Sequence, residues 1–433
     1  MSLLIDCAYV LLLLVVGPFY WVKRRWTGKR TAPIGERLGC FTAPSPPTGP
    51  RIWIHAVSVG EVLAARGLIA SLKERRADVD VFLTATTVAG LDVARKTYPD
   101  LRIVPSPLDF SFAVRRFLRS VRPDALVLIE LELWPNLLRA AERAGVPVFV
   151  ANARVSERSA GRYRLLAKIW PGFLRPVSIF LAQGPEHVAR LRDLGLKPER
   201  IVQAGNLKFD NAVPSEAEPL RSSLRAELGF GPEDRVLVAG STHPGEERFV
   251  IEAFLRIASG TPAARLLLAP RHLERLFEVT ALLSALQLRA SRRSDRNRPP
   301  GCPCVLLDTT GELGRFYAIA DVAFVGGTMV PIGGHNLLEP AAFGVPMVTG
   351  PHLKTVRDTA DLFAEAGALV EVKDAAALAA CVGGMFASPE DSRTRGALAK
   401  GLIESRRGAA ARCADTILAG LRRGAARERM SDG

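Results

Sequence analysis

Short apolar runs rich in β-branched residues alternate with stretches of helical periodicity along most of the chain. Such alternation is typical of repeated strand–helix–strand units and predicts parallel sheets covered by helices. A first series of runs predicts strands at Ile52–Val57, Val79–Thr84, Arg102–Val104, Ala125–Ile129, Val146–Val150 and Ile179–Ala182. A second series predicts strands at Val236–Ala239, Arg265–Leu268, Val305–Leu307, Val322–Val325, Val345–Val348 and Ala368–Val372.

The polar stretch Asn211–Pro219 separates the two series and predicts two domains. We expect an α/β protein with two Rossmann-like, doubly wound domains that face a cleft, at residues 31–210 and 211–433. The second would end in a long amphipathic helix. The length of 433 residues agrees, because it exceeds one ordinary hydrophobic core. Open parallel sheets bind ligands at the carboxyl ends of their strands, so we expect the site in the cleft.

Residues 1–30 predict a membrane anchor helix with a basic flank. Residues 3–22 are apolar except for Asp6 and are long enough for a helix to cross a bilayer. An aromatic and basic flank follows and predicts that the main body lies on the cytoplasmic side of the membrane: Phe19, Tyr20, Trp21, Trp26, Lys23, Arg24, Arg25, Lys29 and Arg30. Asp6 and Gly17-Pro18 interrupt the segment, so a helix within the membrane interface and a buried core helix stay open.

The net charge of the chain and the absence of three well-known motifs make several functional classes less favoured. The formal charge of +14 favours polyanionic partners, namely nucleic acid, anionic lipid or phosphorylated substrates. Six scattered cysteines argue against a disulfide framework. The sequence has no P-loop, no clean dinucleotide fingerprint and no H-E-x-x-H, so an NTPase, an ordinary dehydrogenase and a zincin lose support. Asp78-Val79-Asp80 begins a predicted strand, where we expect solvated carboxylates and no metal site.

Four predicted strand-to-helix turns carry a glutamate: Ser58–Glu61, Ser241–Glu246, Thr309–Glu312 and Asn336–Glu339. The first and third match a capping box, in which the glutamate binds the backbone at the start of its own helix. A functional interpretation stays open, because helix N-termini attract phosphate and a glutamate there can act as a base. The glycine-rich run 326–334 predicts a loop that lets a ligand approach the backbone.

Further polar residues follow predicted strands. Glu130 and Glu132 leave a buried strand on one side of it, where carboxylates are site candidates. Lys208 sits where the first domain ends and is a candidate for the same cleft. Arg271 follows another strand, where a guanidinium suits a phosphate. His272 and His335 are candidates as well, although an ordinary loop histidine explains His335 equally.

Seven segments spread over nearly the whole chain carry a family resemblance: HAVSVGE (55–61), ELELWPNL (130–137), VANAR (150–154), GNLKFD (205–210), GSTHPGEE (240–247), APRHLER (269–275) and the run 311–352. Taken together, these segments resemble the 3-deoxy-D-manno-octulosonic acid (Kdo) transferases of lipopolysaccharide assembly. The resemblance implies a GT-B fold that binds the acceptor on the N-terminal domain and CMP-Kdo on the C-terminal domain. It implies an inverting glycosyltransferase that moves Kdo from CMP-Kdo to a lipid A precursor at the cytoplasmic face of the inner membrane.

The resemblance also implies roles for individual residues. Glu61 matches the general base, and Glu130 and Lys208 match residues that stabilise the transition state. Whether Glu130 or Glu132 matters more stays open, because both lie in the matching segment. The segments that match the CMP-binding residues are Pro270 and Arg271; Thr310, Gly311 and Glu312; and Asn336, Leu337, Leu338 and Glu339.

The chemistry of the donor sets the expected partners. CMP leaves with a single phosphate, which amide dipoles and one cation can hold, so we expect no metal and no cofactor besides the donor substrate. The basic surface and the anchor predict contact with membrane lipids and a phosphorylated glycolipid, and not with nucleic acid. Two alternatives stay open: a GT-B transferase or epimerase that uses a UDP-sugar, and a membrane-bound module that binds nucleic acid without catalysis.

Overall fold

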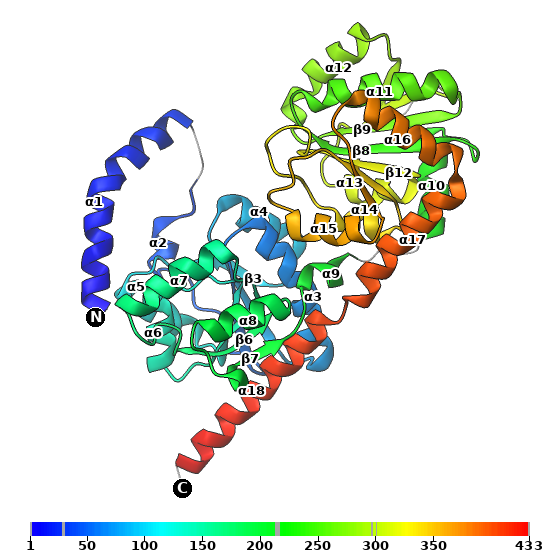
Figure 1. The fold of residues 1–433 in the computed structure, drawn as a ribbon. Coiled ribbons are helices and arrows are strands. Elements are labelled where there is room, and N and C mark those ends of the chain that lie inside the picture. The colour runs from blue at the N-terminus through cyan, green and yellow to red at the C-terminus, as the bar shows by residue number, and fades with distance from the viewer. Residues whose placement is uncertain (1, 28–30, 213–216, 296–297, 300, 432–433) are drawn as a thin grey trace. The chain divides into compact units, whose positions relative to one another are not determined.

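The computed structural model describes residues 2–27, 31–212, 217–295, 298–299 and 301–431 (Figure 1). The chain forms two compact units: residues 1–211 with 406–433, and residues 212–405. Each unit contains one seven-stranded sheet in which all neighbouring strands are parallel. The predicted α/β class with two doubly wound sheets is confirmed.

The sheet of the first unit has the order β3-β2-β1-β4-β5-β6-β7. The order reverses between β1 and β4, which is the topological switch point where such sheets bind ligands. Each predicted strand of the first series is present, and β7 is additional. The strands are β1 (Arg51–Ala56), β2 (Asp80–Ala85), β3 (Arg102–Pro105), β4 (Ala125–Ile129), β5 (Val148–Ala153), β6 (Val177–Ala182) and β7 (Ile201–Gln203).

Helices cover both faces of this sheet. Ile52 and Ile54 of β1 enter one hydrophobic core and Trp53 enters the other, because side chains alternate along a strand. Two buried faces explain why the strands read as continuous apolar runs. The helices are α2 (Ile34–Arg37), α3 (Val59–Arg75), α4 (Val88–Thr97), α5 (Ser111–Val121), α6 (Pro135–Arg143), α7 (Glu157–Ile169), α8 (Pro185–Asp193) and α9 (Leu207–Asn211), with a 3₁₀ turn at Pro198–Arg200.

The C-terminal helix α18 (Ala409–Ser431) belongs to the first unit, whereas we expected it in the second domain. Ala410, Cys413 and Ile417 are buried in the same core as the inner face of α3. Small residues allow the close approach, since a Cβ on Gly67 would lie 3.3 Å from that of Ala410. The Asp210 carboxylate accepts the backbone N–H groups of Gly408 and Ala410, at 2.5 and 2.9 Å, and caps the start of α18.

The second unit repeats the architecture with the strand order β10-β11-β9-β8-β12-β13-β14. The order reverses at β8, and β10 is the strand absent from our prediction. The strands are β8 (Arg235–Thr242), β9 (Ala264–Pro270), β10 (Ala290–Arg292), β11 (Cys304–Leu306), β12 (Val322–Val325), β13 (Met347–Thr349) and β14 (Leu369–Glu371). The helices are α10 (Ala217–Leu228), α11 (Glu246–Gly260), α12 (Leu276–Ala285), α13 (Leu313–Phe316), α14 (Leu338–Ala342), α15 (Arg357–Glu365), α16 (Ala375–Ala387) and α17 (Pro389–Ser405), with 3₁₀ turns at Leu273–Arg275 and Tyr317–Ile319.

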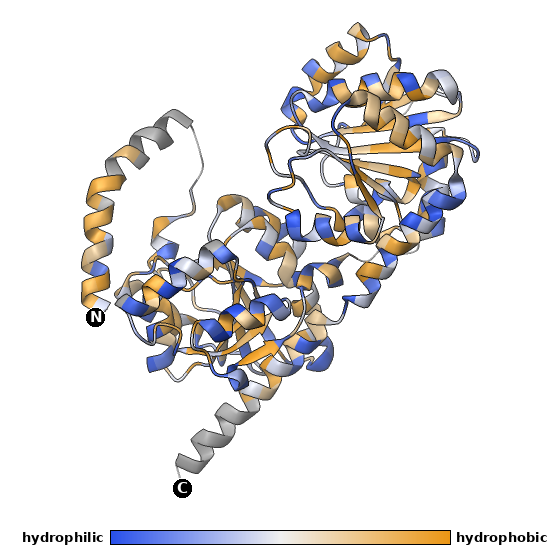
Figure 2. Ribbon diagram, in the orientation of Figure 1, coloured by the Kyte–Doolittle hydropathy of each residue, from blue (hydrophilic) through white to orange (hydrophobic). Residues whose placement is uncertain are grey.

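The apolar N-terminal segment forms one helix, α1 (Ser2–Thr27), whose coloured part in Figure 2 is mostly hydrophobic. Many of its leucines and valines are exposed. The Asp6 carboxylate accepts hydrogen bonds from Ser111 N and Asn136 Nδ2, both at 2.9 Å, so this acid ties α1 to the starts of α5 and α6. Within the described part of the chain, no helix combines the length and apolarity needed to cross a membrane. The expected spanning helix is therefore not confirmed. The side chains of the basic flank, residues 23–30, lie outside the described ones.

Candidate active site

Three glutamates and a lysine gather at the carboxyl edge of the first sheet, around its switch point. Glu61 is in the first turn of α3, directly after β1, while Glu130 and Glu132 follow β4, the strand paired with β1. Lys208 is in α9, and its Nζ lies 3.6 Å from Glu130 Oε1. The structure therefore brings together the three predicted catalytic residues Glu61, Glu130 and Lys208.

Glu61 forms a capping interaction at the start of α3. Ser58 is the N-cap, and its hydroxyl donates a hydrogen bond to Glu61 Oε1 at 2.8 Å. Glu61 Oε2 accepts the backbone N–H of Val57 at 2.7 Å. Burial raises the pKa of Glu61, and the negative charge of Glu130 adds to this effect, although both hydrogen bonds oppose it. Glu61 thus has a structural role and a perturbed acidity at once.

Glu130 adopts an unusual backbone conformation. Its φ is +62°, a left-handed value that residues other than glycine rarely adopt. The chain leaves the sheet at Ile129, so the strand alternation that we expected for Glu130 and Glu132 does not apply. Asn152 is also left-handed, with φ of +58°, and its Oδ1 accepts the N–H of Leu207 at 3.0 Å. This bond fixes the start of α9, which presents Lys208 to Glu130.

Glu132 is the carboxylate with the most perturbed acidity in this group. Burial raises its pKa to about 7, and the negative charges of Glu61 and Glu130 contribute. Three glutamate carboxylates and the Lys208 ammonium lie at this edge, so negative charges are close to one another. Such crowding is typical of catalytic sites rather than of stable surfaces. The sequence offered Glu132 only as an alternative to Glu130, and the structure places both in the cluster.

The carboxyl edge of the second sheet carries the predicted CMP-binding segments. Pro270 ends β9 and is followed by Arg271; Thr310, Gly311 and Glu312 follow β11, and Asn336, Leu337, Leu338 and Glu339 follow β12. Thr309 donates a hydrogen bond to the Glu312 carboxylate, but α13 begins only at Leu313. The predicted capping box at Thr309–Glu312 is therefore not formed. Asn336 Nδ2 donates to Glu339 Oε1 at 3.0 Å, while burial raises the pKa of Glu339.

Two histidines face each other on this second edge. His243 Nε2 and His335 Nε2 lie 2.7 Å apart in rings tilted by only 2°, with centroids 5.0 Å apart. These values describe two rings in one plane that share an N–H···N hydrogen bond, so one Nε2 carries the proton and the other accepts it. Burial and neighbouring positive groups lower the pKa of His335 to about 4. Burial lowers the pKa of His243 as well, so both rings are neutral at physiological pH.

The glycine-rich loop is organised by a protein carboxylate. Glu246 is fully buried and accepts the N–H groups of Gly327, Thr328 and Met329 at 2.7, 2.9 and 2.8 Å, together with that of His243 at 2.9 Å. Glu246 thus engages the N–H groups of residues 327–329, so a ligand that approaches this loop would have to meet other groups of its backbone. Gly327 needs to be glycine for another reason: its φ is +70°, and a Cβ would lie 2.9 Å from the His335 ring.

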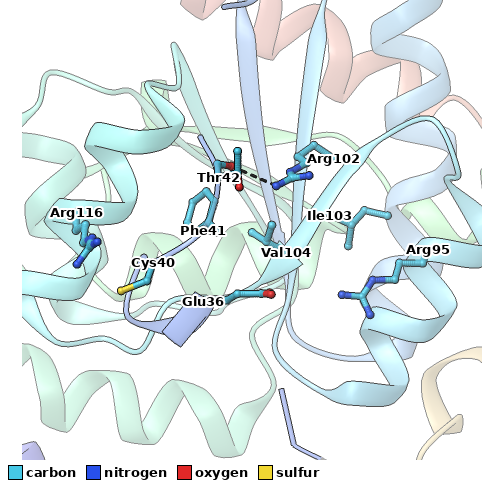
Figure 3. Close-up of a pocket in the computed structure, with 9 residues that line it drawn as sticks. All are labelled: Glu36, Cys40, Phe41, Thr42, Arg95, Arg102, Ile103, Val104 and Arg116. Carbon is cyan, nitrogen blue, oxygen red and sulfur yellow. Dashed lines mark hydrogen bonds between the residues drawn. The ribbon is translucent and has the colours of Figure 1, made fainter. Parts of the chain in front are cut away.

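A large cavity of about 710 Å³ lies in the first unit beside the edge strand β3 (Figure 3). Arg95, Arg102 and Arg116 line it together with Glu36 and apolar side chains. None of the predicted catalytic residues lines it, so it is separate from the carboxylate cluster. Among the described residues, no group of three or more His, Cys, Asp or Glu side chains could hold a metal ion.

Comparison with known proteins shows extensive similarity. A family model described as 3-deoxy-D-manno-octulosonic-acid transferase (kdotransferase) matches residues 32–211. The chain is 34% identical over 388 residues to the 3-deoxy-D-manno-octulosonic acid transferase of Haemophilus influenzae. The aligned region covers 89% of this chain and 90% of that protein. It is 35% identical over 390 residues to the transferase of the same name from Bordetella pertussis, with coverage of 85% and 88%.

Solved structures share the fold. The UDP-GlcNAc 2-epimerase of Neisseria meningitidis superimposes with a TM-score of 0.58 at 10% identity, covering 86% of this chain and 100% of that one. A glycosyltransferase from Rickettsia africae gives a TM-score of 0.55 at 11% identity, with coverage of 86% and 99%. At these identities the likeness concerns the fold alone, and the GT-B architecture that we predicted is confirmed.

Proposed function

The chain belongs to the Kdo transferase family of glycosyltransferases, and we propose that it transfers Kdo from CMP-Kdo to a lipid A precursor similar to lipid IVA, with inversion. The observation that carries this proposal is the cluster of Glu61, Glu130, Glu132 and Lys208 at the switch point of the first sheet. We assign the acceptor to the first unit and the donor to the second, where Arg271 and the segments after β11 and β12 lie on one edge.

The reaction displaces CMP at the anomeric carbon of Kdo. The acceptor hydroxyl oxygen forms the new bond to that carbon, and its proton passes to Glu61. The bond from the anomeric carbon to the CMP phosphate oxygen breaks, and its electron pair leaves on the phosphate. The transition state carries positive charge on the sugar ring, which the negative charge of Glu130 stabilises. Lys208 holds Glu130 in place through their ion pair at 3.6 Å.

Glu61 can act as a base without leaving its capping position. A carboxylate has about four lone-pair positions, and in Glu61 each oxygen accepts one hydrogen bond from the protein. One position on each oxygen is therefore open to a substrate proton. A base works best with a pKa near the working pH, and the raised pKa of Glu61 suits that role.

The donor segments favour a metal-independent reaction. A guanidinium such as that of Arg271 can hold the single phosphate of CMP with two parallel hydrogen bonds. Asn336 and Glu339, already joined at 3.0 Å, present polar groups for the ribose. We therefore expect activity in the presence of a chelator.

We place the enzyme at the cytoplasmic face of the inner membrane. The exposed leucines and valines of α1 and the formal charge of +14 support this placement, since apolar side chains enter the acyl region while basic residues attract anionic headgroups.

The test measures Kdo transfer from CMP-Kdo to a tetraacyl lipid A precursor, with product mass as the readout. Glu61→Gln should lower kcat by about 10²–10⁴-fold, while CMP binding and thermal stability stay close to wild type, because the amide oxygen still accepts a capping hydrogen bond. Glu157→Gln, at the first turn of α7 outside the cluster, is the matched control and should keep full activity. No product from wild type, with thermal protection by UDP-sugars instead of CMP, would reject the proposal.

A further inference from the structure

Asp6 and Tyr9 give the apolar helix α1 a polar side. They are three positions apart, so their side chains lie on the same face of the helix. Both residues are partly buried, whereas many leucines and valines of α1 are exposed. In the sequence Asp6 only interrupts an apolar segment, but in the fold its contacts give it a definite place.

Asp6 contacts the first residues of two helices. Its Oδ1 accepts the backbone N–H of Ser111 and the side-chain N–H of Asn136, both at 2.9 Å, and its Oδ2 accepts the Ser111 hydroxyl at 2.5 Å. The N-cap residues of α5 and α6, Phe110 and Trp134, make no capping hydrogen bond with their side chains. The free N–H groups at a helix start need an acceptor, and α5 receives one from α1.

Asp109 supplies the acceptor for α6, and Tyr9 binds to it. The two Asp109 oxygens accept the N–H groups of Asn136 and Leu137, at 3.0 and 2.8 Å. The Tyr9 hydroxyl donates to Asp109 at 3.0 Å, and the Tyr9 ring meets that of Phe110 edge-on, with centroids 5.9 Å apart. Helix α1 thus reaches the start of α6 by a second path. We call the following residues the α1 clamp: Asp6, Tyr9, Asp109, Ser111 and Asn136.

Packing of the fold gives no reason for the α1 clamp. The hydrophobic cores of the first unit are formed by residues from Ala32 onward, so the described residues of α1 lie outside them. The clamp also has a cost, because burial raises the pKa of Asp109 to about 6 and the negative charge of Asp6 adds to this rise. Two carboxylates held close together are more typical of a functional element than of a stabilising one.

The start of α6 continues directly from the turn at residues 130–134, which carries Glu130 and Glu132. The backbone N–H of Trp134 donates to the Glu132 carbonyl at 3.2 Å, and the N–H of Leu138 donates to the Trp134 carbonyl at 3.0 Å. The Trp134 side chain also forms a hydrogen bond to the Glu132 carboxylate that favours its ionised form. A shift of the first turn of α6 would therefore move the Glu132 carboxylate.

We propose that Asp6 and Tyr9 are positioning residues for the reaction: they fasten α1 to the starts of α5 and α6 and thereby hold the turn at residues 130–134 in place. This inference rests on the proposed function, which locates the chemistry at that turn. The exposed leucines of α1 stay free to enter a lipid surface. The α1 clamp then joins the helix that contacts the membrane to the turn that carries the glutamates.

Two variants of Asp6 keep nearly the shape of the aspartate and differ in their capacity to accept hydrogen bonds. Asp6→Leu has no acceptor and opens the clamp. Asp6→Asn keeps an oxygen for Ser111 and Asn136, and its amide N–H can donate to the Ser111 hydroxyl, so it should keep wild-type activity. With tetraacyl precursor in detergent micelles, Asp6→Leu should lower kcat by about 10–10²-fold, because a misplacement of about 1 Å can cost about 10²-fold. KM for CMP-Kdo should not change.

A matched control and a membrane assay show whether the α1 clamp causes this loss. Asp193→Leu makes the same exchange at an exposed residue of α8 and should keep wild-type kcat. Asp6→Leu should bind vesicles of anionic phospholipid as tightly as wild type, because the exposed leucines of α1 are unchanged. A loss of vesicle binding that parallels the loss of kcat would overturn the proposal. If Asp6→Leu fails to fold, Tyr9→Phe, which removes one hydrogen bond of the clamp, takes its place in each assay.

Hydrogen exchange separates this inference from the proposed function, because it reports on the clamp without any transfer. In Asp6→Leu the N–H groups of residues 130–138 should exchange roughly tenfold faster than in wild type, the usual effect of one hydrogen bond to a charged group, while β4 stays unchanged. Faster exchange, with no Kdo-lipid formed by wild type, would keep the clamp and reject the proposed reaction. Transfer by wild type with equal kcat in Asp6→Leu, or with lower kcat but unchanged exchange, would keep the reaction and reject the positioning role.

Discussion

Replacing Glu132 with glutamine should stabilise the folded protein above neutral pH. Burial and two neighbouring carboxylates raise the pKa of Glu132 from 4.5 to about 7. Between these values the unfolded chain has released the proton while the folded protein retains it. The free energy of unfolding therefore falls as pH rises through this window, and the loss is complete above about pH 7. Glutamine has no proton to lose, so it avoids this penalty.

The magnitude follows from the size of the shift. A difference of about 2.5 pKa units corresponds to about 3 kcal/mol at 1.36 kcal/mol per unit. Glu132 is only half-buried, and solvent screens part of its interaction with Glu61 and Glu130. We therefore expect a gain of about 1–2 kcal/mol at pH 8, which corresponds to a rise in Tm of roughly 2–8 °C for a unit of this size.

Thermal unfolding of Glu132→Gln, wild type and Glu142→Gln from pH 4 to pH 8 measures this effect. The Glu132→Gln advantage should be near zero at pH 4, grow through pH 5–7 and level off. Glu142→Gln changes a glutamate of α6 that pairs with Arg175 at the surface, so its difference from wild type should not follow this curve. An advantage of Glu132→Gln that is the same at every pH, or a lower Tm at pH 8, would refute the reasoning.

Three further changes test other parts of the structure. Glu130→Gln removes a negative charge that raises the pKa of Glu61. The acidic side of the plot of kcat/KM against pH should therefore move to lower pH. If it does not move, the charges of Glu61 and Glu130 do not interact as we infer. Arg271→Lys should weaken CMP binding roughly tenfold by calorimetry, because an ammonium cannot make two parallel hydrogen bonds to a phosphate, and Arg256→Lys on the surface of α11 should not. Asp210→Ala removes the cap of α18 and should lower the free energy of unfolding of the first unit by about 1–2 kcal/mol, seen as a lower denaturant midpoint; an unchanged midpoint would contradict the capping role.

The strands were predictable from sequence because both faces of each sheet are buried. Continuous apolar runs such as Ala125–Ile129 therefore stand out against their polar surroundings. The strands β7 and β10 escaped prediction because three residues at a sheet edge carry no such run: Ile201–Gln203 is followed by Ala-Gly-Asn, and Ala290–Arg292 contains one buried residue. Neighbouring strands, and not the local pattern, define both elements.

The return of the chain to the first unit could not be read from the sequence. The periodicity of the C-terminal stretch predicts a helix with one buried face, but it does not say which core that face enters. The choice depends on the fit of Ala410 against Gly67 and on the cap from Asp210. These partners are about 200 and more residues away from α18 along the chain, beyond the reach of any local pattern.

The same limit applies to two similar glutamates whose carboxylates make different contacts. Glu61 and Glu246 each follow a strand and a polar turn, and local sequence gives no reason to separate them. Four backbone N–H groups, three of them from residues 327–329, fill two lone-pair positions on each oxygen of Glu246, so no position is left for a substrate. In Glu61, one N–H and one hydroxyl leave a position open on each oxygen. Contacts made across the fold thus determine that Glu246 holds a loop in place while Glu61 keeps the capacity to accept a proton.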